Sequence, residues 1–335
     1  MTGPAREMPA CRRLRGYAFD PSLSQIIDTV DVNDIVYEVP WEPLGPGPVG
    51  EYLEVLDHDP SVDQFYAPVD LDRGYLLATD GLAPSESNPQ FHQQMVYAVA
   101  SLTIQNFERA LGRKIIWAPR VTDDPDDPEE YVGRLRIYPH ALREANAYYS
   151  PLKKAILCGY FAATPANRAR LMPGALVFTC LSHDIIAHEL THAILDGLYR
   201  HYNRPSNPDV LAFHEAFADL AALFQHFSFP EVLKHQIART RGELEQQNLL
   251  GELAQQFGLA IGRHGSLRDA LGAVDRETGT WRPAPPRPTD YERHTEPHRR
   301  GSVLVAAVFE AFLTVYKRRV EDLLRIASGG TGVLP

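Results

Sequence analysis

The clearest candidate for chemistry in this chain is the segment His188-Glu189-Leu190-Thr191-His192. Residues four apart on an α-helix differ by about 40° around its axis, so both imidazoles would project from one face and could bind one cation. Glu189 would face another direction, from which it can take a proton from a metal-bound water. Neutral imidazoles are good ligands for Zn²⁺. The segment therefore predicts a zinc held by His188 and His192, with Glu189 as general base.

A catalytic zinc needs a third protein ligand and an open position for water. Glu215 lies 23 residues after His192, and Asp219 follows four residues later, so the two acids would share a face of the next helix. Glu215 would complete a His₂Glu set, and Asp219 would accept the outer ring N–H of a ligating histidine. His214 is the competing ligand. It would point about 100° away from Glu215, and we favour Glu215 because Asp219 shares its face.

The elements that must position these residues follow from hydrophobic periodicity and from turn residues. A helical pattern ends at Gly112, strand-like runs come next, and the second half of the chain is mostly helical, which predicts an α+β fold. The predicted strands are 34–39, 134–138, 155–161 and 175–180, and the predicted helices are 91–111, 181–198, 209–227 and 302–327.

The ordered motifs resemble those of the thermolysin-type gluzincin metallopeptidases over residues 91–316, about two-thirds of the chain. His188–Ala193 and Glu215–Asp219 match the two metal motifs of that family. Asn146-Ala147-Tyr148-Tyr149 is similar to the family's edge strand, where Asn146 and the backbone of Ala147 would hold the substrate peptide as an added strand.

The resemblance also implies roles further along the chain. Ser266-Leu267-Arg268 resembles a family segment whose arginine contacts the substrate carbonyl. His298 would stabilise the oxyanion together with a tyrosine, which is Tyr202 or Tyr199, with Tyr202 preferred. The acid that orients this histidine has no clear counterpart, and Glu296 and Asp290 are both candidates. Asp184 matches a family calcium ligand, but His226 stands where its partner carboxylate is expected, which argues against Ca²⁺.

The fold that the resemblance implies is a zincin with its active-site cleft between two subdomains. Residues 91–197 would form a mixed α/β subdomain with the metal-binding helix, and residues 198–335 a mainly helical subdomain with the third ligand. Residues 1–90 would form a divergent N-terminal or pro-like region, in which we find no chemistry. The chain ends without an evident final element, which leaves open that it is a fragment of a longer protein.

Bulk composition excludes several other classes of protein. Hydrophobic residues make up 44% and charged residues 23%, which is typical of a globular protein. The net charge of -10 argues against nucleic-acid and membrane-surface partners, since both require a basic surface. Three scattered cysteines, no membrane span and no apolar signal segment favour a cytoplasmic location, with export by another route left open.

The isolated histidines have no partner at ligand spacing in the sequence, so we do not expect them to bind metal. They are His58, His92, His140 and His264. The sequence as a whole predicts a zinc peptidase acting on a peptide or protein. The alternatives are a hydrolase of the same fold dedicated to a small amide or a biosynthetic peptide, and a non-catalytic zinc module, against which Glu189 argues. The oligomeric state stays open.

Overall fold

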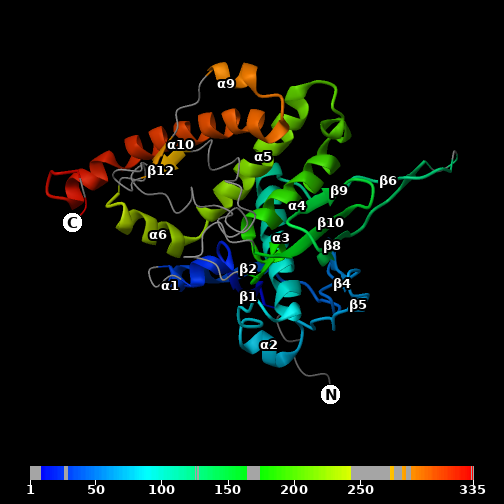
Figure 1. The fold of residues 1–335 in the computed structure, drawn as a ribbon. Helices are drawn as coiled ribbons and strands as arrows, with labels where there is room; N and C mark the ends of the chain where they lie inside the picture. The colour runs from blue at the N-terminus through cyan, green and yellow to red at the C-terminus, as the bar shows by residue number, and fades with distance from the viewer. Residues whose placement is uncertain are drawn as a thin grey trace. The chain divides into compact units, whose positions relative to one another are not determined.

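The computed structural model describes residues 9–25, 29–124, 126, 128–163, 174–242, 272–274, 281–283, 288–332 and 334 (Figure 1). The chain forms two compact units. Unit 1 contains residues 1–162 and 176–198, and unit 2 contains residues 163–175 and 199–335. Each unit is described by itself below.

Unit 1 is built on a mixed sheet in the strand order β11-β10-β8-β3, with β9 also paired to β10. β8 is parallel to both β3 and β10, whereas β9 and β11 run antiparallel to β10. The bounds are β3 Leu53–Val55, β8 Leu135–Leu142, β9 Ala147–Ser150, β10 Ala155–Ala162 and β11 Leu176–Phe178. The predicted strands 134–138 and 155–161 are confirmed as β8 and β10, but the predicted strand 175–180 ends at Phe178, where the 3-10 helix Thr179–Leu181 begins. The pairing of β3 with β8 brings the N-terminal region into the same sheet.

Smaller elements complete unit 1. β1 and β2 form an antiparallel pair, β4 pairs with β5, and β6 pairs with β7 in a hairpin that projects from the main sheet (Figure 1). Their bounds are β1 Cys11–Tyr17, β2 Asp34–Pro40, β4 His58–Asp59, β5 Gln64–Phe65, β6 Arg120–Val121 and β7 Glu129–Glu130. The short helices are η1 Pro21–Gln25, α1 Val30–Asn33 and α2 Gly74–Ala78.

Helix α3 (Pro89–Leu111) packs against the sheet and carries its own start and stop signals. The Asn88 side chain accepts the backbone N–H of Gln90, and Gly112 ends the helix in the left-handed conformation at φ 67°. These are the cap and terminator that the sequence pattern predicts. The first three turns are buried on all sides rather than on one stripe, and their polar side chains are hydrogen-bonded.

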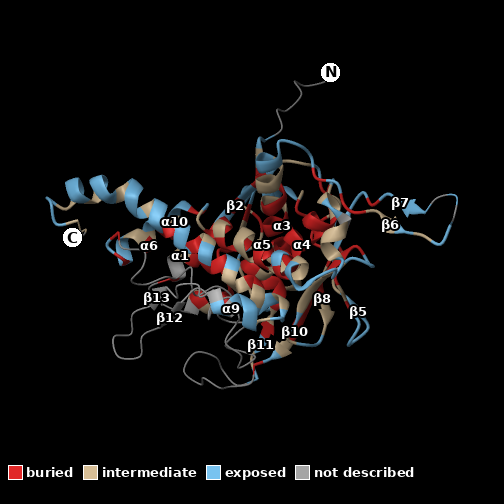
Figure 2. Ribbon diagram, turned by 90° about the horizontal axis from the view of Figure 1, so that it is seen from above, coloured by how far each residue is buried: buried red, intermediate tan, exposed pale blue. Residues whose placement is uncertain are grey.

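Helix α4 (His183–Leu198) follows the short helix η2 (Thr179–Leu181) and packs on α3. Figure 2 shows that both helices carry many buried residues. The start of α4 is fixed, because the His183 N–H donates to the carbonyl of Phe19 and its Nδ1 lies 2.8 Å from the Tyr37 hydroxyl. The predicted metal-binding helix is thereby confirmed as a helix and is held within the core of unit 1.

Unit 2 is largely helical in its described part. Its elements are η3 Arg200–Asn203, α5 Pro208–His226, α6 Pro230–Arg239, α9 Pro288–Arg293 and α10 Pro297–Ala327, with a strand pair β12 Gly272–Val274 and β13 Trp281–Pro283. α10 packs along α5. The mixed α/β content and the several small sheets agree with the predicted α+β class. No helix in the described ranges is long and apolar enough to cross a membrane.

Gly301 sets how closely α10 approaches α5. A Cβ at this position would lie 2.5 Å from the carbonyl oxygen of Ala212 and 3.2 Å from the backbone nitrogen of Ala216. Gly301→Ala is therefore expected to force the two helices apart and to lower the free energy of unfolding by about 1–3 kcal/mol, measured by denaturant titration. Gly74→Ala is the control, because a Cβ there meets nothing within 4 Å. Equal stability of the two variants would contradict this packing.

Candidate metal centre

His188 and His192 lie one turn apart on α4 and turn the same ring nitrogen toward each other. Their Nε2 atoms are 2.9 Å apart, and the rings meet edge to face at 89° with centroids 4.5 Å apart. Together with Glu189 they form a group whose candidate ligand atoms all lie within 4.8 Å of one another. The predicted convergence of the two imidazoles is thus present, and the group can hold a metal ion.

The Glu189 carboxylate is fixed by the edge strand β9. Its Oε2 accepts the backbone N–H of Tyr149 at 2.8 Å, and Glu189 is 9% exposed. Because the Tyr149 N–H donates to Glu189 on α4, it does not pair with β10. Along a strand, the backbone N–H and C=O groups of successive residues point to opposite edges. The backbone of Ala147, two residues earlier, therefore faces the same side as that of Tyr149. The outer edge of β9 and the Glu189 carboxylate lie next to each other.

Asn146 precedes this strand and is held close to β10. The backbone segment 144–146 crosses Gly159, where a Cβ would lie 2.3 Å from the carbonyl oxygen of Glu144 and 2.5 Å from that of Asn146. The Asn146 N–H donates to the Glu144 carbonyl at 2.9 Å. A side chain at position 159 would push this segment outward, so Gly159 fixes where β9 begins. The structure thus brings Asn146, Ala147 and Glu189 to one region of unit 1.

A buried polar cluster ties the side chain of Tyr149 to the end of α4. The Tyr149 hydroxyl donates to Asp196 Oδ2 at 2.7 Å, and Lys154 Nζ donates to the same oxygen at 2.9 Å. Burial, and then the Asp196 charge, raises the pKa of the Tyr149 hydroxyl well above its usual value, so it remains a donor. The strand is thus attached to α4 twice, through the Tyr149 backbone and through its side chain.

Unit 2 brings together Glu215 on α5 and His298 on α10. His298 Nε2 lies 3.2 Å from Glu215 Oε2. The Glu215 side chain is 19% exposed, so its carboxylate is accessible to a metal ion. α10 and α5 approach closely at Gly301, one turn after His298, and this brings the His298 and Glu215 side chains into contact. Glu215, the ligand favoured from the sequence, contacts His298, and His214, the competing ligand, is 5% exposed.

Glu296 is the acid that orients His298. Its Oε1 lies 2.7 Å from His298 Nδ1, and its carboxylate also caps α10 by accepting the N–H groups of His298 and Arg299. Burial opposes ionisation of Glu296, but the Arg299 N–H and the His298 contacts outweigh it and lower the pKa of the carboxyl. Glu296, one of the two candidates from the sequence, contacts the ring. Only a doubly protonated His298 can donate to Glu215 and Glu296 together.

The remaining predicted site residues are distributed as follows. Tyr202 lies in η3, and its ring packs on Phe213 of α5 with centroids 5.7 Å apart, while Tyr199 is 53% exposed. Asp219 follows Glu215 by one turn on α5. Arg268 lies outside the described residues. The predicted residues therefore fall into two groups, one within each unit.

His92 and His140 have no partner at ligand spacing in the sequence, but the fold does give them potential partner ligands, which corrects the expectation that they are isolated. The fold brings them together with Cys180 in a second group of potential ligands, all three buried. They come from α3, β8 and η2, so no spacing in the sequence could reveal them. His58 lies elsewhere in unit 1, with its Nε2 3.4 Å from Asp63 Oδ1 and its side chain 29% exposed.

If His298 has the role that the family resemblance implies, His298→Ala is expected to lower kcat and kcat/KM together by roughly 100- to 1,000-fold, with little change in KM or bound zinc, because an oxyanion donor would be lost. His294→Ala is the matched control, since the backbone carbonyl of His294 accepts Arg300 whatever the side chain is. Steady-state kinetics and metal analysis of both variants decide. If the loss followed His294 instead, our assignment of the donor would be wrong.

No protein-family model matches the chain, and no curated protein is significantly similar to it.

Proposed function

We propose that this protein is a zinc metallopeptidase of gluzincin type. The observation that carries the proposal is the meeting of His188 Nε2 and His192 Nε2 at 2.9 Å beside the Glu189 carboxylate. A bound Zn²⁺ would polarise the substrate carbonyl and lower the pKa of its water to about 7. Two imidazoles alone would leave the ion short of protein ligands, and we assign the third to Glu215.

Glu189 is the residue of this chain that would accept the proton of the attacking water. Its Oε2 is occupied by the Tyr149 N–H at 2.8 Å, which fixes the carboxylate on the side where β9 exposes its edge. A peptide added along β9 would pair with backbone groups of Ala147 and pass in front of this carboxylate. The zinc-bound water, its general base Glu189 and the substrate-binding edge of β9 would then lie together.

The residues of unit 2 would stabilise the product of attack. His298, held by Glu296 at 2.7 Å, is a pre-oriented N–H donor of the kind that stabilises an oxyanion. We assign Tyr202 as the second donor, Asp219 as support for a ligating histidine, and Asn146 and Arg268 to substrate binding. In this proposal, the zincin arrangement with its cleft brings the two groups of residues together.

A library of internally quenched peptides tests the reaction class. We expect cleavage of a subset of sequences, lost when a chelator removes zinc. Hydrolysis of only small amides would instead favour the dedicated amide hydrolase. Stoichiometric zinc without turnover of any peptide or amide would contradict an enzymatic role.

A further inference from the structure

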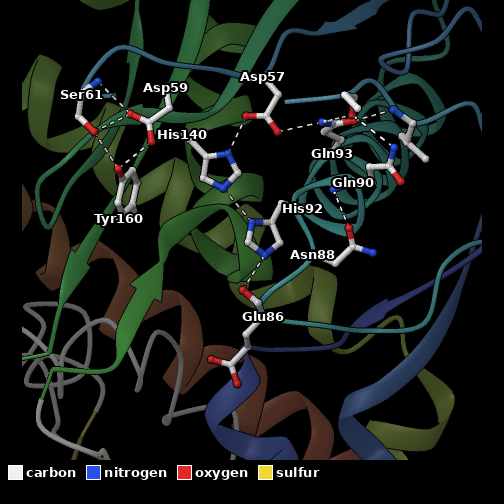
Figure 3. Close-up of polar contacts among 12 residues, drawn as sticks. Asp57, Asp59, Ser61, Glu86, Asn88, Gln90, His92, Gln93, His140 and Tyr160 are labelled. Carbon is white, nitrogen blue, oxygen red and sulfur yellow. Dashed lines mark hydrogen bonds and ion pairs between the residues drawn. The ribbon is translucent and has the colours of Figure 1, made fainter. Parts of the chain in front are cut away.

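A second group of metal-ligating side chains lies in the core of unit 1, and the peptidase proposal does not use it. His92, His140 and Cys180 are 1%, 2% and 0% exposed, and their candidate ligand atoms all lie within 4.8 Å of one another. Figure 3 shows the two histidines in a chain of polar contacts that runs from Asp57 to Glu86. The ends of this chain determine which ring nitrogens carry protons.

Both outer ring nitrogens contact oxygen atoms, one of a carboxyl group and one of a backbone carbonyl. His140 Nδ1 lies 2.6 Å from Asp57 Oδ1, and His92 Nε2 lies 3.1 Å from the backbone carbonyl of Glu86. The other oxygen of Asp57 accepts the side-chain amide of Gln93 at 2.9 Å, so the carboxylate accepts on both sides. With Asp57 as a carboxylate, each imidazole carries its proton on the outer nitrogen.

The inner nitrogens are then left with lone pairs that face each other. His140 Nε2 and His92 Nδ1 are only 2.8 Å apart (Figure 3). Two lone pairs at this distance repel unless a cation lies with them. The outer contacts, one to a carboxylate and one to a backbone carbonyl, are those that hold metal-ligating histidines in proteins.

The cation can be a proton or a metal ion, and the surroundings favour the metal. Phe178 packs against both rings, with centroids 4.7 and 5.5 Å away. Cys180 supplies a third donor, which a shared proton would not need. The two positive charges of a divalent ion would be balanced by the negative charges of the Cys180 thiolate and the Asp57 carboxylate.

We propose that His92, His140 and Cys180 bind a divalent transition-metal ion, Zn²⁺ foremost, as a structural site separate from the candidate catalytic one. Two imidazoles and a thiolate are ligands that Zn²⁺ favours. On binding, the ion displaces the thiol proton of Cys180 and any proton shared by the rings, and both pass to solvent. The ion would join α3, β8 and η2, and η2 leads directly into α4.

Cobalt distinguishes the two sites, because only a thiolate ligand gives a near-ultraviolet thiolate-to-cobalt charge-transfer band. The full chain is produced in cobalt-supplemented medium, so that the buried site fills during folding, and metal content and absorption are measured. We expect about two cobalt ions per chain and the band in the wild type. Cys180→Ala should lose the band and one equivalent, whereas His188→Ala should lose one equivalent and keep the band.

Cys158→Ala is the matched control, since Cys158 is also a free cysteine with 0% exposure but lies outside the group. It should keep both the band and the metal. Absence of the band in the wild type would overturn the proposal without any substitution and would leave a proton between the rings. A band that survives Cys180→Ala, or disappears in Cys158→Ala, would equally overturn the assignment. None of these outcomes depends on peptide hydrolysis.

Discussion

Glu189→Gln is expected to keep zinc at the His188/His192 site and to slow peptide hydrolysis by roughly 100- to 10,000-fold, the range that a positioned general base contributes. The amide has nearly the shape of the carboxylate but cannot take a proton from water. Its oxygen can still accept the Tyr149 N–H, which the carboxylate accepts at 2.8 Å. The anchor of β9 is therefore kept while the base is removed, and kcat at equal bound zinc is the measurement.

The matched control is Glu54→Gln. Glu54 is a glutamate of the same unit, and it forms an ion pair with Arg136 at 3.0 Å at the surface. A surface pair of this kind contributes at most about 1 kcal/mol, and its loss should leave turnover unchanged. Wild-type turnover in Glu189→Gln would remove the general-base assignment, and an equal loss in both variants would point to a general effect of the charge.

His188→Ala and His192→Ala should each lose one equivalent of zinc on dialysis, and turnover should fall to background. The reason is geometric, because the two Nε2 atoms converge at 2.9 Å, and one imidazole with Glu215 supplies one protein ligand fewer than the three of a catalytic zinc site. Metal analysis and peptide hydrolysis on the same samples give both readouts. Metal held by His92, His140 and Cys180 would remain, so the expected change is one equivalent and not complete loss.

His58→Ala is the control for these two substitutions. Its ring stacks on Phe65 at the surface, and it belongs to neither of the two groups of potential ligands. It should keep the full metal content and full activity. Unchanged zinc in both His188→Ala and His192→Ala would contradict the metal assignment, whatever happened to turnover.

The parts that the sequence could predict are those with local causes. His188 and His192 are four residues apart, and helix geometry alone places both side chains on one face, as the structure has them. Asn88 and Gly112 bound α3 because capping and left-handed termination depend only on neighbouring residues. For the same reason the predicted helices 209–227 and 302–327 correspond to α5 and α10, although α10 begins five residues earlier.

The parts that it could not predict depend on contacts between distant residues. His92 and His140 are 48 residues apart, and their meeting requires α3 to pack on β8. Asp57 lies in the region where the sequence indicated no chemistry, yet it holds His140, because β3 pairs with β8 just before it. The choice between Glu296 and Asp290 was open for a similar reason, since it depends on how the start of α10 turns the His298 ring.

Reconstitution with zinc tests the central claim most directly. The chain is stripped with a chelator, and turnover of a cleaved peptide is measured while zinc is added back in sub-stoichiometric steps. We predict no turnover in the stripped chain and a return that reaches its plateau when the His188/His192 site is filled, with no return in His188→Ala. Full turnover in a chain shown by metal analysis to be free of zinc would contradict the account.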